Sequence, residues 1–570
     1  MTSIGIDFGT TNSVVSVHSS TGVEVLPIDS APVEWSPYGY DNVFPSVMST
    51  DKNGQISFGW KAKNSSEGKF EAVKRMFATQ LDLAMNEEGD ALAVEEVATM
   101  LFAELKSRTI SMGGISDPNS AVITVPANSK GRARHRTKLC AGMAGLEVLA
   151  LINEPTAAAM AYAQRHPEAR QLLVFDWGGG TLDVTVLQSV DGIFIEKSSA
   201  GLPHRGGLDF DSRLEKIVRE SVPGLESLNP EERHLLKLEV ELAKIRLSDS
   251  EATTLEIPGG RSHRVTRSRF EQEIEPLLQD SKEPILRCLN DLNISPGGLD
   301  AVVLVGGTCK IPAVRSLVRE VTQLEPDPDI NPLTAIGEGA AIAAAILSGD
   351  LEDSDFFVSL EHALGTYVFD LSTYGQEFST LIPRGHALPA VASDTFVPIS
   401  REQDGVQVSV VEGDPDASNP DFTTLKEWYV PLPETYTEDS DRAIELHYEY
   451  DVDGILSVKV NDVDTGNLLF EDDVSYGIAT NKLELKKMSD RAKDAVASGT
   501  TEGKGKVEVS DPESLKLITQ ARMKVIPFLD SSEVGPIERA IEELEQSSDE
   551  ERSKYREALK KELSPYSYLF

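Results

Sequence analysis

Asp7–Ser13 reads DFGTTNS, and Asp176–Asp183 reads DWGGGTLD. Each segment lies between two apolar, β-branched runs, so the sequence predicts a strand-turn-strand unit at both places. Glycine lets backbone N–H groups approach phosphate oxygens, and threonine hydroxyls add donors that tolerate close approach. Two loops of one design therefore predict a site that binds the phosphates of ATP between them. The predicted phosphate contacts are Gly9, Thr10, Thr11, Asn12, Gly178, Gly179, Gly180 and Thr181.

Three aspartates accompany these loops. Asp7 and Asp176 end the first strand of each unit, and Asp183 follows the second loop. Carboxylates that share a cleft repel each other unless a cation lies between them, and Mg²⁺ held largely through its waters suits such a site. A single loop of this kind is equally consistent with a glycine turn and a chance aspartate. The loops match neither the P-loop nor the dinucleotide-binding pattern.

Three further segments carry residues suited to the same cleft. The glycines of Val305-Gly306-Gly307-Thr308 would let an adenosine or an α-phosphate approach the backbone. Glu241, Lys244 and Ser248 share one face of a predicted helix, where they are either nucleoside contacts or part of a solvated, salt-bridged surface. Gly206-Gly207 is explained equally well by a plain turn.

The pattern of the chain changes twice along its length. Up to about residue 350, strand-like runs alternate with amphipathic helical segments, which is typical of an α/β fold. The repeated strand-loop-strand unit indicates two facing lobes. Alternating strands and an Asp453-Gly454 hairpin signal then predict an all-β domain, and the last part has helical spacing. The predicted parts are a nucleotide-binding domain over 1–350, an apolar linker over 351–360, an all-β domain over 361–480 and a short helical region over 481–570.

Individual elements can be placed within the first part. The clearest predicted strands are Ser3–Asp7, Val14–His18, Ala121–Val125, Leu172–Asp176, Val184–Gln188 and Ala301–Val305. The predicted helices are Leu92–Ser107, Pro230–Leu247 and Gln272–Leu292, the second with Asn229 as its N-cap.

Composition excludes several classes of protein. The 570 residues carry a net charge of −39, whereas a nucleic-acid-binding protein needs a cationic face to displace counterions. No apolar run is long enough to cross a bilayer, and no cleavable apolar segment precedes Ile4, so we expect neither membrane insertion nor secretion. Cys140, Cys288 and Cys309 form no metal-type pair and are too few for a disulfide framework, which favours a cytoplasmic protein.

Nine segments, taken in order, resemble the 70-kDa heat-shock chaperones of the DnaK type over about residues 3–475. The resemblance implies an actin-like α/β ATPase with two lobes of a duplicated ribonuclease-H-like fold, an all-β sandwich that binds peptide, and a short α-helical lid. It implies an ATP-dependent chaperone whose ATP hydrolysis controls its hold on exposed hydrophobic peptides, with ATP or ADP, Mg²⁺ and, as a further candidate, K⁺. The segments are IGIDFGTTNS, ITVPA, AGLEVLALINEPTAAAMAY, FDWGGGTLDV, GGLDFD, ELAKIRLS, VVLVGGTCKIP, EGAAIAAAIL and FVPISREQDGVQVSVVEGD.

The resemblance also implies roles for single residues. Lys74 matches the lysine that orients the attacking water, although alone it would be taken for a surface lysine. Pro126 and Arg134 match a switch pair that senses nucleotide near Glu154, although a proline after a strand is also a rigid terminator. The implied catalytic residues are Lys74, Thr10, Thr181, Glu154 and Asp176. The implied metal set is Asp7, Asp176 and Asp183, mostly through water, and the further nucleotide contacts are Gly206, Gly207, Glu241, Lys244, Ser248, Gly306, Gly307 and Thr308.

Matching residues in the all-β domain imply a peptide pocket formed by Phe369, Phe396, Val406 and Val408. Alternating apolar residues of a β-domain are, however, first of all core residues. An extended peptide would pair with strand edges while an apolar side chain enters the pocket.

Several positions depart from the family pattern. The linker carries Phe356 and Phe357 without the closing aspartate, and Ala150 replaces an arginine. Both features belong to the engagement of J-domain co-chaperones, so we expect either no J-domain stimulation or a divergent partner; a nucleotide exchange factor is a further expected partner. Leu333-Thr334 removes an acidic residue beside the nucleotide.

Two other functions stay open. One is a nucleotide-binding regulator or exchange-factor-like relative that hardly hydrolyses ATP, against which Lys74, Thr10, Thr181 and Glu154 all count. The other is a small-molecule kinase of the wider superfamily, in which the all-β domain and the apolar linker would have no role.

Overall fold

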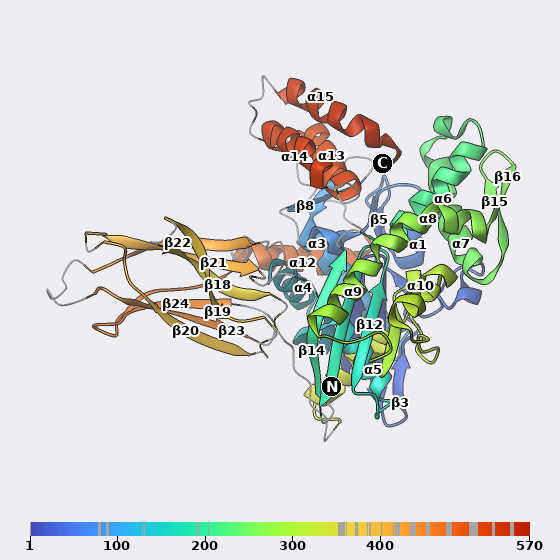
Figure 1. The fold of residues 1–570 in the computed structure, drawn as a ribbon. Helices are drawn as coiled ribbons and strands as arrows, with labels where there is room; N and C mark the ends of the chain where they lie inside the picture. The colour runs from blue at the N-terminus through green and yellow to red at the C-terminus, as the bar shows by residue number, and fades with distance from the viewer. Residues whose placement is uncertain are drawn as a thin grey trace.

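The structure is a computed structural model in three parts: an α/β domain, a β-sandwich and a bundle of C-terminal helices (Figure 1). The predicted linker residues Phe356 and Phe357 and the predicted Asp453-Gly454 turn lie outside the residues it describes. It describes residues 2–569 apart from 78–80, 87–89, 128, 130, 191–192, 203–204, 352–359, 361, 371–373, 385, 387–388, 401, 414, 416–421, 434–440, 452–455, 475–481, 501–510, 527–530, 546 and 548–551.

The first lobe of the α/β domain is built on a six-stranded sheet in the order β11-β10-β1-β2-β3, with β4 beside β2. The first two strands are antiparallel and joined by the first predicted phosphate loop, while β10 pairs in parallel with β1, and β11 with β10. The bounds are β1 Ser3–Phe8, β2 Asn12–Ser19, β3 Gly22–Val25, β4 Phe44–Pro45, β10 Ser120–Val125 and β11 Glu147–Asn153.

The second lobe repeats this plan in a four-stranded sheet of order β14-β13-β12-β17. Strands β12 and β13 are antiparallel and joined by the second predicted phosphate loop, and β17 lies parallel to β12. Strand order and direction match β3-β2-β1-β10, as the predicted duplication requires. The bounds are β12 Gln171–Trp177, β13 Leu182–Val190, β14 Ile193–Leu202 and β17 Ala301–Val305.

Two alanine-rich helices join the lobes. Helices α5 (Glu154–Ala163) and α11 (Ala335–Leu347) pack on each other, and α11 also packs on β1 and β2. Their inner faces share one core with strands of both lobes, including Val122 and Val174. Small side chains let these helices approach each other and the sheets closely, so one helix from the middle of the domain's sequence and one from its end hold the lobes together.

The remaining predicted helices are found with changed bounds. Helix α3 (Val94–Ser111) begins two residues later than predicted, because Ala91–Ala93 pairs as β9 with β8 (Leu83–Met85). Helix α7 (Pro230–Asp249) begins with the predicted cap, in which Asn229 Oδ1 accepts from the Glu232 N–H.

One helix prediction is wrong. Residues 272–292 do not form one helix; α8 (Arg267–Asp280) and α9 (Lys282–Asp291) meet at Ser281. Pro284 lies in the first turn of α9, where its missing N–H leaves no partner unsatisfied, but its ring would clash with the Asp280 carbonyl if α8 continued. The other elements of the domain are β5 Met48–Thr50, β6 Ile56–Phe58, α1 Gly59–Lys63, β7 Lys69–Phe70, α2 Val73–Met76, α4 Gly131–Met143, α6 Gly207–Ser221, β15 Ala252–Ile257, β16 Arg261–Thr266 and α10 Pro312–Thr322.

The all-β part forms two four-stranded antiparallel sheets, β19-β18-β21-β22 and β20-β23-β24-β25. Alternate residues of both sheets fill one core, in which Leu364, Val410, Tyr448 and Val458 are fully buried. The bounds are β18 Ala363–Asp370, β19 Gly375–Ile382, β20 Ala390–Phe396, β21 Gly405–Gly413, β22 Thr423–Pro431, β23 Ile444–Tyr450, β24 Leu456–Asp462 and β25 Leu468–Asp473.

The C-terminal helices lie in two groups, and their role as a lid stays a prediction. Helix α12 (Lys482–Ser498) packs on α3 and α4 of the first lobe, where Ala492 and Ala495 join the lobe's own core. Arg491 makes a two-pronged ion pair with Glu96 at 3.1 Å. Helices α13 (Pro512–Gln520), α14 (Ser531–Glu545) and α15 (Arg552–Leu563) form a separate small core. Within the described part of the chain, no helix combines the length and apolarity needed to span a membrane.

Candidate nucleotide site

The two predicted phosphate loops face each other. A Cβ added at Gly179 would lie 2.5 Å from Thr11 Oγ1, and one at Gly180 would lie 3.3 Å from Thr10 Cγ2. Arg75 follows Lys74 on α2 and donates from Nη2 to the Gly180 carbonyl at 2.8 Å. The β1–β2 and β12–β13 turns are therefore in contact, and glycine in the second turn makes room for the threonines of the first.

A buried ion pair lies beside these loops. Lys74 Nζ donates to Glu154 Oε1 at 2.6 Å, and the two side chains are 8% and 10% exposed. Lys74 lies on the short helix α2, and Glu154 is the first residue of α5. Ala72, just before α2, has a left-handed φ of 53°, a strained conformation of the kind that concentrates at functional sites. Two of the five residues for which the resemblance implies a catalytic role, Lys74 and Glu154, thus lie together.

Two of the predicted aspartates carry strongly shifted pKa values. Burial, followed by the nearby Glu154, raises the pKa of Asp7 to about 7, against the opposing effects of Lys74 and of the Thr124 hydroxyl that donates to Asp7 at 2.9 Å. Burial, followed by Glu154 and Asp183, raises the pKa of Asp176 well above its usual range. One lysine does not balance this many carboxylates. Buried oxygen ligands with excess negative charge fit Mg²⁺, which would be held by Asp7, Asp176 and Asp183 largely through its waters.

We therefore expect Mg²⁺ binding to compete with protons. The folded-state pKa of Asp7, about 7, lies above the ordinary aspartate value of 3.8, so its ionised form costs folding stability, and this cost grows as the pH rises between those two values. Mg²⁺ favours the ionised carboxylate, so its affinity should fall by up to about tenfold per pH unit below pH 7 for each proton displaced. Calorimetric Mg²⁺ titration at pH 8 and pH 6 with saturating ADP measures this. If the Mg²⁺ affinity is the same at pH 6 and pH 8, both in the wild type and in Asp7→Asn, Mg²⁺ does not compete with protons at this site.

A cavity of about 390 Å³ continues from the loops toward α7. Lys244 pairs with Asp211 at 2.8 Å and donates to the Gly207 carbonyl at 3.0 Å. Thr308 Oγ1 donates to the Gly178 carbonyl, which also accepts from the Gly207 N–H. The predicted residues that line the cavity are Thr11, Asn12, Gly179, Gly207, Glu241, Lys244, Ser248, Gly307 and Thr308.

Two other predicted glycines stand at the border of this cavity. Gly306 has a left-handed φ of 83°, and a Cβ there would lie 2.3 Å from the Trp177 carbonyl, so glycine is required. The Gly206 N–H donates to Asp209 Oδ2 at 2.6 Å, which fixes the turn before α6. The structure thus brings the four glycine segments together around one cleft, and their contact with nucleotide stays a prediction.

Comparison with known proteins identifies the family. The sequence profile described as Hsp70 protein matches residues 71–568. The chain belongs to the Hsp70 family. It is similar to the chaperone protein dnaK of Cyanophora paradoxa, at 31% identity over 604 residues that cover 98% of this chain and 94% of that protein. The resemblance predicted from the motifs is confirmed, and membership supports a chaperone function and ATP binding in general terms.

The predicted switch residues of this Hsp70 lie next to the ion pair. Pro126 follows β10, and its carbonyl accepts from the Ser129 N–H, as a strand terminator would. Arg134 on α4 is buried and donates to Asn153 Oδ1, and Asn153 directly precedes Glu154. Asn153 also donates to Glu196 at 3.0 Å. A shift of Arg134 would therefore reach Glu154 through one residue, which is what the switch prediction needs.

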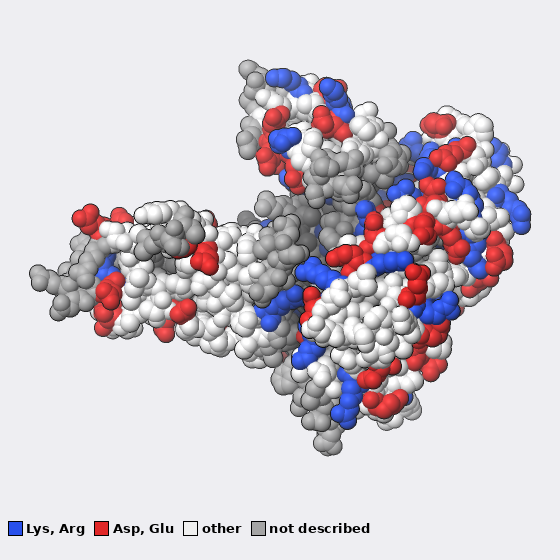
Figure 2. Space-filling model, in the orientation of Figure 1, with Lys and Arg blue, Asp and Glu red and all other residues white. Residues whose placement is uncertain are grey.

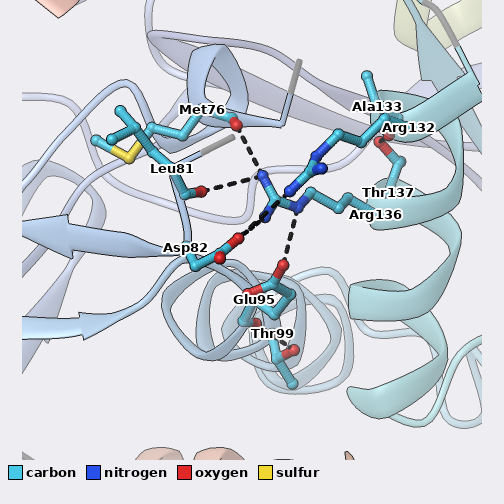
Figure 3. A network of polar contacts seen from close by, with 9 residues as sticks. All are labelled: Met76, Leu81, Asp82, Glu95, Thr99, Arg132, Ala133, Arg136 and Thr137. Carbon is cyan, nitrogen blue, oxygen red and sulfur yellow. Dashed lines mark hydrogen bonds and ion pairs between the residues drawn. The ribbon is translucent and has the colours of Figure 1, made fainter. Parts of the chain in front are cut away.

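A buried arginine not predicted from the sequence holds Lys74's helix in place (Figure 3). Arg136 on α4 is fully buried and donates to the carbonyls of Met76 and Leu81 at 2.9 and 3.1 Å. It also pairs with Asp82 at 2.7 Å and Glu95 at 2.8 Å. Since Met76 ends α2, Arg136 ties the helix of Lys74 to α3 and α4.

The structure divides the predicted peptide residues of the Hsp70 sandwich. Val408 is 3% exposed within the core, and Phe396 and Val406 are partly buried against that core. Phe369 is 41% exposed and contacts Tyr374 edge to face. Val408 is therefore a core residue in this structure, and a peptide contact at Phe369, Phe396 and Val406 stays a prediction.

Several residues around the Hsp70 cleft were missed from the sequence. Lys63 of α1 pairs with Glu241 of α7 at 2.7 Å, and so connects the two lobes. The buried rings of Trp35, Tyr40 and Trp60 lie beside it. The many aromatic residues in Trp35–Phe44 could have indicated a buried cluster, but the sequence does not show which surface their rings face.

Proposed function

We propose that this Hsp70 hydrolyses ATP and uses ATP binding and hydrolysis to control how tightly its β-sandwich holds exposed hydrophobic peptide. The observation that carries the proposal is the buried Lys74–Glu154 pair, placed beside two facing phosphate loops and the aspartates Asp7 and Asp176. In-line attack on a γ-phosphate needs charge neutralisation and a positioned water rather than covalent chemistry from the protein.

Each part of the site has a task in this reaction. The backbone N–H groups and the hydroxyls of Thr10 and Thr181 would bind the terminal phosphates. Glu154 holds Lys74 Nζ at 2.6 Å, from where the lysine would orient the attacking water and offset the charge of the γ-phosphate. Mg²⁺, when bound, supplies the further charge neutralisation that phosphoryl transfer requires.

Contacts of the sandwich with the α/β domain support control of peptide binding. Leu139 of α4 packs against the sandwich core. Arg384 of the sandwich donates to the Ser199 carbonyl of the second lobe at 3.0 Å. Burial lowers the pKa of His135 on α4, and Asp451 of the sandwich opposes this shift, so the two side chains lie near each other. Helix α4 therefore connects the cleft, through Arg134, with the sandwich, through Leu139.

The sandwich has the surface that a peptide-binding domain needs. More than half of the exposed large apolar side chains among the described residues belong to it, including Phe369, Val391, Val397, Ile399 and Tyr429. Figure 2 shows few charged side chains over much of the sandwich surface in view, whereas acidic and basic side chains are interspersed on the α/β domain. Exposed apolar surface of this kind marks an interaction site.

Peptide release kinetics test the coupling. ATP should speed release of a bound fluorescent hydrophobic peptide relative to ADP, by about 5- to 150-fold, the usual range of coupling energies. Leu139→Asp should remove this ATP effect while peptide binding with ADP persists. Ile110→Asp, at a 45% exposed position of α3, is the matched control and should behave as wild type. Equal release rates with ATP and ADP in wild type would exclude coupling.

The chemistry of the site distinguishes an ATP hydrolase from a nucleotide-binding regulator that hardly cleaves ATP. A chain that binds ATP without cleaving it has no need of a buried lysine held by a glutamate beside both loops, so the intact pair favours hydrolysis. Thr181→Ala should slow single-turnover hydrolysis, and equal rates in wild type and variant would favour the regulator.

The co-chaperone prediction rests on one position that the structure describes. Ala150 is buried in β11 opposite Val122 and offers no charge to a partner. We propose that J-domain stimulation is weak or uses a divergent partner, and that an exchange factor and a cytoplasmic location follow the family pattern.

A further inference from the structure

A buried glutamate of the second lobe contacts the start of helix α5. Glu196 lies on β14 and is 9% exposed. Its two carboxylate oxygens accept separate hydrogen bonds: Oε2 from the Asn153 amide at 3.0 Å, and Oε1 from the Thr156 hydroxyl. These two donors stand on either side of Glu154, the first residue of the helix. Glu196 therefore fixes the chain both before and after Glu154.

A β-bulge turns this glutamate toward α5. Glu196 lies opposite Leu187 of β13, and Ser198 lies opposite Val186, so Lys197 is the extra residue of the bulge. In a regular strand, side chains two residues apart lie on the same face of the sheet. Here they lie on opposite faces, because Glu196 contacts α5 while the Ser198 hydroxyl donates to a carboxylate of α9 at 2.9 Å. The extra residue thus directs the glutamate to the helix that carries Glu154.

The hydrogen-bond pattern requires the glutamate to be an acceptor at both oxygens. Arg134 can only donate, so the oxygen of the Asn153 side chain faces Arg134 and its amide group faces Glu196. Asn153 is the N-cap of α5, yet its side chain caps no N–H group of the described helix, since that oxygen binds Arg134 instead. An ionised carboxylate accepts at both oxygens, and the positive end of the α5 dipole favours its charge. A glutamine in its place could not accept from both donors.

We propose that Glu196 is a positioning residue for ATP hydrolysis, which orients Glu154 and, through it, Lys74. This inference rests on the proposed function, because it takes the Lys74–Glu154 pair to act in hydrolysis. Glu154 Oε1 accepts from Lys74 Nζ at 2.6 Å, so a small rotation of the first turn of α5 would displace both groups of the pair. Among the described residues, neither Glu196 nor Thr156 lines the cavity, so the loss of their contact leaves the predicted nucleotide contacts in place.

Single-turnover ATP hydrolysis and equilibrium ATP affinity, measured on the same variants, test the positioning role. Glu196→Gln keeps the size of the side chain but loses one of its two hydrogen bonds, and should slow hydrolysis by roughly 10- to 100-fold. Its affinity for ATP should stay at the wild-type value, since the lining of the cavity is unchanged. Ser198→Ala is the matched control, because it removes a buried hydrogen bond of the same strand on the α9 side. It should hydrolyse ATP at the wild-type rate.

A double variant shows whether Glu196 acts through Glu154. In a chain that already carries Glu154→Gln, adding Glu196→Gln should slow hydrolysis by clearly less than it does in the wild type. An undiminished effect in that chain would overturn the positioning role. So would a wild-type rate in the single variant Glu196→Gln, or a loss of ATP affinity as large as the loss of rate.

Two further results are decided by the same measurements. Should Glu196→Gln fail to fold, Thr156→Val removes one of the two donors from the other side of the contact and is judged by the same criteria. A wild-type chain that binds ATP without hydrolysing it would refute the proposed function, whereas a wild-type chain that hydrolyses ATP at the rate of Glu196→Gln would refute the positioning role alone.

Discussion

Replacing Lys74 by alanine is expected to slow single-turnover ATP hydrolysis by roughly 10²–10³-fold while ATP binding persists. Lys74 Nζ is buried and held by Glu154 beside the two loops, so its charge acts where the dielectric screening of water is weak. Loss of that charge removes stabilisation that matters most in the transition state, because charge on the γ-phosphoryl oxygens is redistributed there. Acid-quench assays with radiolabelled ATP at saturating enzyme measure the rate.

A matched control is available on the same lobe. Lys61 of α1 is an exposed lysine, and Lys61→Ala should leave hydrolysis unchanged. Glu154→Gln should also slow hydrolysis, since it weakens the hold on Lys74 without removing the lysine. If Lys74→Ala hydrolyses ATP at the rate of Lys61→Ala, the lysine has no role in the chemistry and the catalytic assignment fails.

Arg136→Ala is expected to destabilise the first lobe by about 3–5 kcal/mol. The substitution removes one partner of a buried network and leaves Glu95, with a side chain 9% exposed, and the carbonyls of Met76 and Leu81 without their donor (Figure 3). The midpoint of the first thermal or urea unfolding transition of the full chain measures the loss of stability. Each transition is analysed separately, because a multidomain chain does not unfold in one step.

Two comparisons sharpen this experiment. Arg165→Ala removes an arginine whose side chain is 46% exposed and pairs with Glu338, so it should cost less than about 1 kcal/mol. Arg136→Lys keeps the charge but loses the planar guanidinium that reaches two carbonyls and two carboxylates. Its loss of stability should lie between those of Arg136→Ala and Arg165→Ala. An Arg136→Ala shift no larger than that of Arg165→Ala would mean that the network contributes little to stability.

The candidate site was largely predictable because its parts are local. Gly9, Gly178–Gly180 and the adjoining aspartates each lie within one strand-turn-strand unit, where β-periodicity and glycine determine the loop almost alone. The Asn229 cap of α7 was predictable for the same reason, since its partner is three residues away. The peptide pocket was less predictable. Apolar and polar residues alternate along a strand in the same way whether an apolar residue such as Val408 faces the core or a ligand.

The sequence by itself determined two glycine-containing strand-turn-strand units, a duplicated α/β pattern, an all-β domain and a helical tail, since each depends on spacing over a few residues. Only the tertiary structure decided that Arg136 ties the helix of Lys74 to α4, that α12 packs on the first lobe, and that Trp35 and Tyr40 share a buried cluster with Ile245 of the second lobe. Those contacts join residues tens to hundreds of positions apart. Local periodicity states that a side chain is buried, but its partner depends on how complete lobes and domains pack together.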